Sequence, residues 1–201
     1  MTMRVAVAVS GRGSNLEALL HALGAEAPAR VVLVLSNRPE AAALERARAH
    51  GIPAEALTDS ADGAEWLDRL ARHEVDLLVL AGYLKLVPAA VIARFRDRVL
   101  NVHPALLPGF GGRGMYGHHV HEAVLASGAR ESGATVHLVD EVYDRGRILA
   151  QARVPVLPED TPDTLAARVL AVEHRLLPAV VLAAAAAGRP IPLSETVEST
   201  S

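Results

Sequence analysis

Short apolar runs rich in β-branched residues alternate with helical patterns along the first half of this chain. Strands that are apolar at nearly every position are typical of a parallel sheet, because neither of its faces meets water. Strands and helices that alternate along a chain build such a sheet through crossover connections. The pattern therefore predicts an α/β fold with a Rossmann-like, mostly parallel twisted sheet and helices on both faces.

The second half of the chain does not follow this alternation of strands and helices. Residues 104–117 contain five glycines and two prolines and predict a long loop, a kind of segment that often carries function. Two later strands joined by a turn predict an antiparallel extension of the sheet, and a long helix follows with Thr161 as N-cap and Pro162 at its first position. The predicted strands are 4–9, 31–36, 54–57, 77–80, 99–103, 135–140 and 148–156, and the predicted helices are 15–23, 41–50, 65–73, 89–95, 118–125 and 164–187.

Composition narrows the class of protein. A chain of 201 residues that is 51% hydrophobic predicts one compact soluble domain. The absence of cysteine excludes disulfides, thiolate catalysis and cysteine-based zinc sites. A net charge of −3 indicates no basic surface for nucleic acid. The longest apolar stretch, 176–187, falls short of the roughly 20 residues that span a bilayer and predicts a buried helix. We therefore expect a cytoplasmic protein with no nucleic acid or membrane partner.

A glycine-rich turn, Ser10–Leu16, follows the first predicted strand and opens a helix. Glycine lets a backbone turn tightly and approach a ligand closely, and the free N–H groups of a helix start favour a phosphate. Leu16 stands where the dinucleotide fingerprint has its third glycine, and no Gly-Lys-Ser/Thr follows, so neither that motif nor a Walker loop is indicated. A monophosphate site and an ordinary turn capped by Ser14 remain the two interpretations.

An amide and an imidazole, Asn101 and His103, lie at the carboxyl end of a predicted parallel strand. They share a face because side chains alternate along a strand, and ligands of open α/β sheets bind at this edge. An Asn side chain can donate to a developing oxyanion, and a His side chain can carry a proton. The pair indicates a catalytic site, with a polar strand end that merely satisfies a loop as the alternative.

Three carboxylates, Asp140, Glu141 and Asp144, lie in or beside the turn between the two antiparallel strands, after His137. A carboxylate near an imidazole orients it and raises its pKa, so each is a candidate partner of His103. The sequence does not choose among them.

Other polar residues favour less specific interpretations. The histidines His118, His119 and His121 do not share one helix face, so a metal site is not favoured. Glu173 interrupts the apolar pattern of the last helix, and that pattern favours an exposed carboxylate over one turned into a ligand cleft.

Taken together, these motifs resemble the phosphoribosylglycinamide formyltransferase family of folate-dependent enzymes, over about residues 4–190. The resemblance implies the formyltransferase fold in a single domain at 1–190, with a phosphoribosyl-binding half at 1–100, a catalytic and folate-binding half at 101–190, and a polar tail at 191–201. The motifs that carry it are Ser10–Leu16, Leu80–Tyr83, Asn101–Pro108, Gly133–His137 and Glu173–His174.

The resemblance implies transfer of the formyl group of 10-formyltetrahydrofolate, a co-substrate, to the amine of N1-(5-phospho-D-ribosyl)glycinamide in purine synthesis, with no metal. It assigns the catalytic roles to Asn101, His103 and Asp144. The residues matching those that bind the ribonucleotide are Gly13, Ser14, Asn15, Leu170, Ala171, Val172 and Glu173. Those matching the folate-binding residues are Leu84, Lys85, Leu86, Val87, Asn101, Asp140, Glu141, Val142, Tyr143 and Asp144.

Two features depart from some members of the family. The loop at 109–116 is longer, and Ala64 stands where some members carry an arginine that contacts folate. Another formyltransferase or a hydrolase that uses 10-formyltetrahydrofolate is the alternative, as is a nucleotide- or folate-binding protein without turnover. We expect a monomer or a homodimer.

Overall fold

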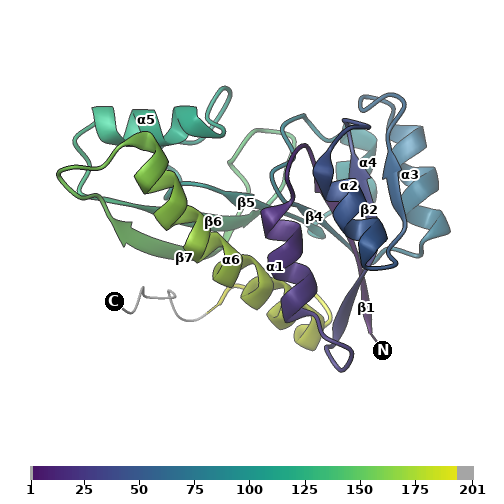
Figure 1. Ribbon diagram of the computed structural model, residues 1–201. Helices are drawn as coiled ribbons and strands as arrows, with labels where there is room; N and C mark the ends of the chain where they lie inside the picture. Colours follow the sequence, from purple (N-terminus) through teal and green to yellow (C-terminus); the bar gives the residue numbers. More distant parts are fainter. Residues whose placement is uncertain (1, 194–201) are drawn as a thin grey trace.

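The computed structural model describes residues 2–193, so most of the predicted polar tail, 194–201, lies outside the described residues. The strands are β1 (Met3–Val9), β2 (Ala29–Ser36), β3 (Ala54–Ala56), β4 (Leu77–Leu80), β5 (Val99–His103), β6 (Glu131–Leu138) and β7 (Ile148–Pro155). Within the described range they form a seven-stranded sheet in the order β3-β2-β1-β4-β5-β6-β7 (Figure 1). β1 to β5 run parallel, and β6 and β7 each pair antiparallel with the strand before them. Both halves of the predicted sheet are confirmed.

The predicted helices are also present. They are α1 (Ser14–Ala22), α2 (Ala42–Ala49), α3 (Gly63–Arg72), α4 (Ala89–Arg94), α5 (His118–Ala126) and α6 (Pro162–Ala187). The largest error in an element's end is at β6, which begins at Glu131 instead of Thr135. Gly133 lies inside this strand rather than in a loop. Glycine is required there because a Cβ would lie 2.0 Å from the carbonyl oxygen of Ala152 on β7.

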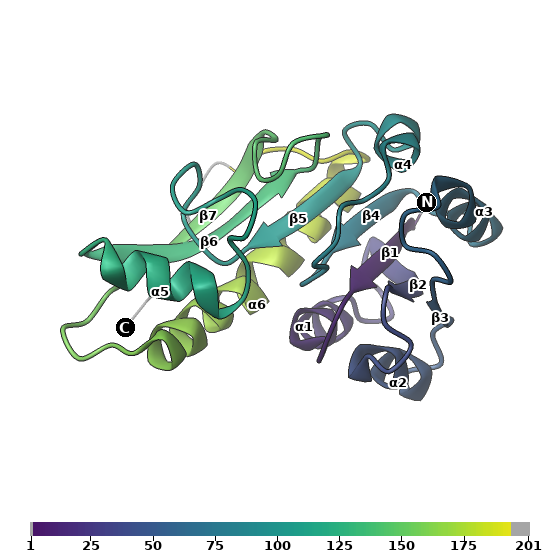
Figure 2. The same ribbon diagram turned by 90° about the horizontal axis from the view of Figure 1, so that it is seen from above.

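The two faces of the sheet have separate apolar cores. Successive residues of β1 point to opposite faces, so Val5 and Val7 pack with α1, α2 and α6 while Ala6 and Ala8 pack with α3 and α4. Figure 2 shows these helices on the two sides of the sheet. This arrangement confirms the predicted helical layers.

α6 is the longest helix, with 26 residues. Thr161 and Thr164 form a reciprocal capping box with Pro162 in the first turn, as predicted for the cap and the proline. By length and composition alone this helix is apolar enough to cross a membrane. It packs instead against β6 and β7, with an apolar stripe buried in the core that includes Leu165, Val169, Val172, Leu176, Leu177, Val180, Val181 and Ala184.

On the face of the sheet that α3 and α4 cover, the side chains change from apolar to polar at β5. Among the described residues, the core beneath α3 and α4 includes side chains of β1, β2, β4 and the start of β5, and none of β6 or β7. The side chains that continue this face are polar: Asn101 is paired directly with His137, and His103 with Thr135. Directly paired residues point to the same side of a sheet. This polar surface forms the floor of the candidate site.

Candidate active site

A cleft of about 1000 Å³ lies at the carboxyl ends of β1, β4 and β5. The chain passes from β1 to β2 on one side and reaches β4 on the other, so the sheet order reverses here. Open α/β sheets bind their ligands at such a reversal. The cleft is lined by Arg12 and Asn15 after β1, by residues 82–87 after β4 and by Asn101 and His103 of β5. Two loops, 112–117 and 139–144, also line it, as do His118 and His121 of α5 and Ala166, Leu170 and Glu173 of α6.

The structure brings Asn101, His103 and Asp144 together on the cleft floor. Oδ1 of Asp144 lies 3.6 Å from Nδ1 of His103 and 3.4 Å from Nε2 of His137. Asp140 and Glu141 are exposed in the same loop, and Asp140 accepts from the backbone N–H of Val142. The carboxylate beside the imidazole is therefore Asp144.

His137 holds the Asn101 amide. Its Nδ1 lies 2.7 Å from the carbonyl oxygen of Leu138, which can only accept, so Nδ1 carries the proton. In the neutral ring Nε2 then accepts from Nδ2 of Asn101 at 3.1 Å. This bond uses one N–H of the amide and leaves the second N–H for another acceptor. In the sequence His137 appears only as the end of a motif of the family resemblance, and its role as acceptor depends on cross-strand pairing.

Both ring nitrogens of His103 face oxygen atoms. Nε2 lies 2.8 Å from the Phe110 carbonyl oxygen, which makes Nε2 a donor, and Nδ1 faces Asp144. Burial lowers the pKa of the His103 imidazole, and it outweighs the Asp144 charge and the Phe110 carbonyl, which raise that pKa. Asp144 thus raises the imidazole pKa as expected, but the almost complete burial of the ring has the larger, opposite effect.

Asp144 stays ionised more readily than an ordinary aspartate. Burial raises its pKa, but the neighbouring imidazoles of His137 and His103 and the hydrogen bond that Oδ2 accepts from the Gly112 N–H at 2.9 Å together bring the pKa below its usual value. The site thus pairs a carboxylate that keeps its charge with an imidazole that readily gives up a proton.

The glycine-rich loop after β5 closes over this pair. It contributes the Phe110 carbonyl to His103 and the Gly112 N–H to Asp144. Phe110 and Asp144 adopt left-handed backbone angles, φ 54° and 55°, which cost about 1–3 kcal/mol each outside glycine. A Cβ at Gly111 would lie 2.5 Å from Cδ2 of Leu107 and 3.1 Å from Cβ of Asp144, so glycine lets the loop lie against the carboxylate.

Asn15 and Glu173 meet at the other end of the cleft. Nδ2 of Asn15 donates to Oε2 of Glu173 at 2.6 Å, and both residues are 7% exposed. The prediction that Glu173 is exposed is wrong: α6 lies beside α1 (Figure 1), and Glu173 accepts the hydrogen bond of Asn15 across that contact. Burial raises the pKa of Glu173 to about 7, with the Asn15 bond opposing that rise.

The remaining residues matched to ribonucleotide binding divide into two groups. Leu170 lines the cleft with Glu173, whereas Ala171 is exposed and Val172 lies in the core, because only positions three or four apart share a helix face. Gly13 packs against Ala43 and is itself the N-cap of α1, so the interpretation of Ser14 as a side-chain cap is wrong.

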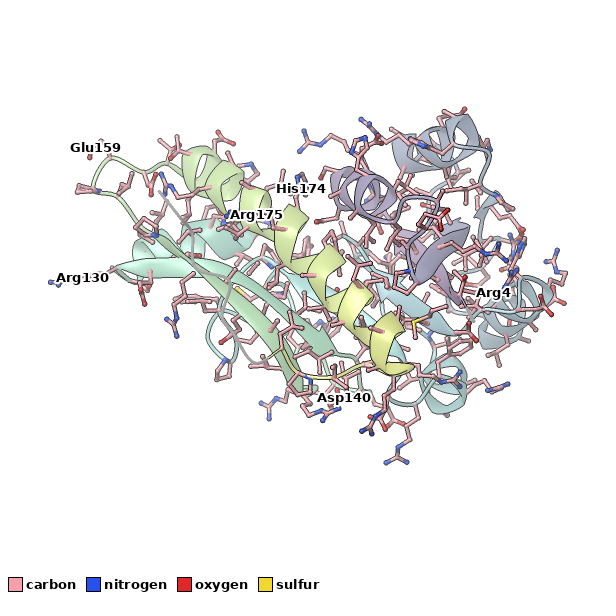
Figure 3. The ribbon with its side chains drawn as sticks, turned by 90° about the horizontal axis from the view of Figure 1, so that it is seen from below. Arg4, Arg130, Asp140, Glu159, His174 and Arg175 are labelled. Atoms are coloured by element: carbon pink, nitrogen blue, oxygen red, sulfur yellow. The ribbon has the colours of Figure 1, made fainter. Side chains whose placement is uncertain are left out.

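Ser14 faces a second, smaller hollow of about 420 Å³ rather than the main cleft. α6 contributes His174 to that hollow, and Figure 3 shows this residue midway along the helix beside α1. Ser14 lines this hollow and Asn15 lines the main cleft, so the first turn of α1, whose leading N–H groups have no partner within the helix, borders both.

Apart from Asn101 on β5, the residues matched to folate binding lie on two loops that line the cleft, 84–87 and 140–144. Four of them form an apolar rim: Leu84 is 41% exposed, Leu86 54%, Val142 55% and Tyr143 40%. The lining residues that sequence reasoning did not assign to the site include Arg12, Arg113 and Tyr116. Their only signal was a place in a glycine-rich turn or loop.

The three histidines of α5 have separate environments. His118 pairs with Asp163 at 3.0 Å, His119 with Glu122 at 3.3 Å, and His121 is buried. In residues 2–193 no group of three or more His, Cys, Asp or Glu side chains is arranged to hold a metal ion.

An open α/β sheet with an amide, an imidazole and a charged carboxylate at its switch point defines an enzyme-like site suited to proton transfer and oxyanion stabilisation. Residues 3–181 match the family model described as formyl transferase, and the chain belongs to this family.

Named relatives agree with this membership. The chain is 47% identical over 186 residues to the chloroplastic phosphoribosylglycinamide formyltransferase of Arabidopsis thaliana, covering 89% of this chain and 64% of the relative. It is 38% identical to phosphoribosylglycinamide formyltransferase of Escherichia coli strain K12, covering 89% and 85%. The structure of glycinamide ribonucleotide transformylase 1 from Symbiobacterium toebii superposes with a TM-score of 0.87 at 37% identity, covering 96% of this chain and 95% of that one. The chain thus spans just under two thirds of the plant relative's length.

Proposed function

We propose that the chain transfers the formyl group of 10-formyltetrahydrofolate to the amine of glycinamide ribonucleotide, giving the N-formyl product and tetrahydrofolate for purine synthesis. The observation that carries this proposal is the meeting of Asn101, His103 and Asp144 in one cleft of a formyl transferase chain. The family's folate-derived donor and the named relatives support the choice of substrates.

The ribonucleotide occupies the part of the cleft between α1 and α6. Its phosphate is held by the backbone of Gly13, Ser14 and Asn15, where the helix dipole and free N–H groups favour an anion. Glu173 accepts hydrogen bonds from the ribose or the amine, with Leu170 beside it, and Ala171 and Val172 contribute through the backbone of the same turn. The amine is thereby directed toward the trio.

The folate lies between the two loops that line the other end of the cleft. The exposed apolar side chains of Leu84, Leu86, Val142 and Tyr143 cover its ring system, and Lys85 and the loop backbone supply polar contacts. The residues assigned to folate remain Leu84–Val87, Asn101 and Asp140–Asp144. The long loop at 109–117 covers the formyl end.

The reaction begins when the neutral amine attacks the formyl carbon and forms a C–N bond. The second N–H of Asn101 stabilises the developing oxyanion, a contribution of about 3–4 kcal/mol for such a donor. The amine loses a proton to the His103–Asp144 pair, whose carboxylate stabilises the imidazolium. The proton then passes to the folate nitrogen as its bond to carbon breaks, a shuttle that typically contributes about 10²–10⁴-fold. No step in this scheme calls for a metal.

The test is to mix the purified protein with glycinamide ribonucleotide and 10-formyltetrahydrofolate and follow loss of the formyl donor. Formation of the N-formyl ribonucleotide in equal amount supports the proposal. Loss of the donor when the ribonucleotide is omitted indicates a hydrolase, and binding of both ligands without loss of the donor indicates a non-catalytic protein.

The same proposal extends to the organisation of the chain. Residues 1–190 act as a single domain, with the phosphate held mainly by 1–100 and the chemistry and folate by 101–190. The enzyme works in the cytoplasm, as a monomer or homodimer, on small molecules rather than on nucleic acid or membranes.

A further inference from the structure

A polar row crosses the sheet beside the catalytic trio. His103 on β5 is paired directly with Thr135 on β6, and Thr135 is paired directly with Gln151 on β7. The three side chains therefore project from one face. Thr135 is fully buried, and neither it nor Gln151 lines the cleft.

Thr135 and Gln151 bind the backbone that follows His103. Oγ1 of Thr135 donates to the Ala105 carbonyl oxygen at 2.7 Å and accepts from the Leu107 N–H at 3.1 Å. Nε2 of Gln151 donates to the Leu107 carbonyl oxygen at 2.9 Å and to Oγ1 of Thr135 at 3.0 Å. The hydroxyl thus uses its one donor and two acceptor positions, and the Gln151 amide uses both N–H groups.

The backbone held in this way is part of an arc formed by residues 103–110. The arc begins at His103, passes through Ala105 and Leu107, and ends at Phe110, whose carbonyl oxygen accepts from Nε2 of His103. A buried network whose members are all satisfied is rigid and specifies one arrangement, whereas a partly satisfied one does not. The path of the arc sets where the Phe110 carbonyl meets the ring.

We propose that Thr135 and Gln151 are positioning residues that fix the arc from Ala105 to Leu107 and thereby hold the Phe110 carbonyl on Nε2 of His103. The effect of these two residues on turnover rests on the proposed function. The structural part of their role, the orientation and tautomer of the His103 ring, is independent of any reaction.

The test compares four variants. Thr135→Val keeps the shape and removes the hydroxyl, Thr135→Ser keeps the hydroxyl, and Gln151→Met keeps the length and removes the amide. Ser132→Ala is the matched control, since Ser132 is a buried serine on the same strand whose hydroxyl has no hydrogen-bond partner. We expect kcat to fall about 10- to 100-fold in Thr135→Val and Gln151→Met, as for a misplaced catalytic group, with each KM changed less than about threefold. Thr135→Ser and Ser132→Ala stay near wild type.

A second readout separates this proposal from the proposed function. The ¹⁵N NMR signals of the His103 ring report whether Nε2 donates to a carbonyl, without substrate. We expect these signals to shift in Thr135→Val and Gln151→Met and to stay unchanged in Thr135→Ser and Ser132→Ala. Unchanged signals in Thr135→Val and Gln151→Met overturn the positioning role. The NMR signals can shift in these variants even if the wild-type protein transfers no formyl group. That result supports the positioning role and contradicts only the proposed function.

Discussion

Nδ1 of His103 lies 3.6 Å from Oδ1 of Asp144, and both side chains are at most 10% exposed. At this distance the carboxylate acts on the ring mainly through its charge. It stabilises an imidazolium whenever the ring gains a proton, and this stabilisation is strong because little water screens the pair.

The first prediction concerns that charge. Asp144→Asn keeps the shape of the side chain and removes the charge, so turnover should fall by about 10²–10⁴-fold while the fold is retained. Steady-state kinetics with circular dichroism measures both effects. Asp68→Asn is the control, because Asp68 lies on α3 in an exposed pair with Arg72. Turnover of Asp144→Asn within a few-fold of wild type contradicts the assignment of Asp144.

The second prediction concerns the bond between Asn101 and His137. Asn101→Ala removes the proposed oxyanion donor and should lower kcat by about 10²–10³-fold. His137→Ala removes the acceptor that orients the amide, a bond between uncharged groups, and should lower kcat about 10-fold. Where His137 acts through Asn101, the double variant should lose no more than Asn101→Ala alone, and a further loss reports the 3.4 Å approach of His137 to Oδ1 of Asp144. Losses that multiply in the double variant show that His137 has a separate role.

Asn101 and His103 were predictable because they depend on local geometry. The period of a strand places both on one face, and the rule for ligand position in open sheets places that face at the site. Their partner was not predictable from the residues alone. Three carboxylates lie in one turn, and the left-handed backbone at Asp144 that returns it to His103 is visible only in the folded loop.

The burial of Glu173 also could not be predicted from the sequence. The helix and its apolar stripe were predictable from the 3.6-residue period, but the period says only that a position lies off that stripe. Whether an off-stripe position meets water or another helix depends on which elements are neighbours. Here the neighbour is α1, and its Asn15 binds a carboxylate that the pattern assigned to solvent.

The third prediction concerns the glycine-rich turn before α1. Gly13 has φ 78°, and a Cβ there would lie 2.6 Å from Cβ of Ala43. Gly13→Ala combines backbone strain with overpacking and should lower the free energy of unfolding by about 2 kcal/mol or more. At Gly11 no atom lies within 4 Å of an added Cβ, so Gly11→Ala should change stability by less than about 1 kcal/mol. Urea denaturation measures both, and equal stabilities contradict the role of α2 in packing against the turn.

The fourth prediction concerns the pH dependence of stability. Burial raises the pKa of Glu173 from 4.5 to about 7, so the folded protein binds a proton between these values that the unfolded chain releases. The contribution of this proton is fully present below pH 4.5 and is lost as pH rises through about 7. Glu173→Gln stays neutral and still accepts from Asn15, so it should be more stable than wild type above pH 7, by up to about 3 kcal/mol.

Urea denaturation of both proteins from pH 5 to pH 8 tests this prediction. The difference in unfolding free energy between Glu173→Gln and wild type should grow with pH across the interval and level off above about 7. Glu159→Gln is the control, since Glu159 is an exposed carboxylate in the turn before α6 and should give a difference near zero at every pH. A constant difference for Glu173→Gln contradicts the raised pKa, because it means that the carboxylate is already charged at pH 5.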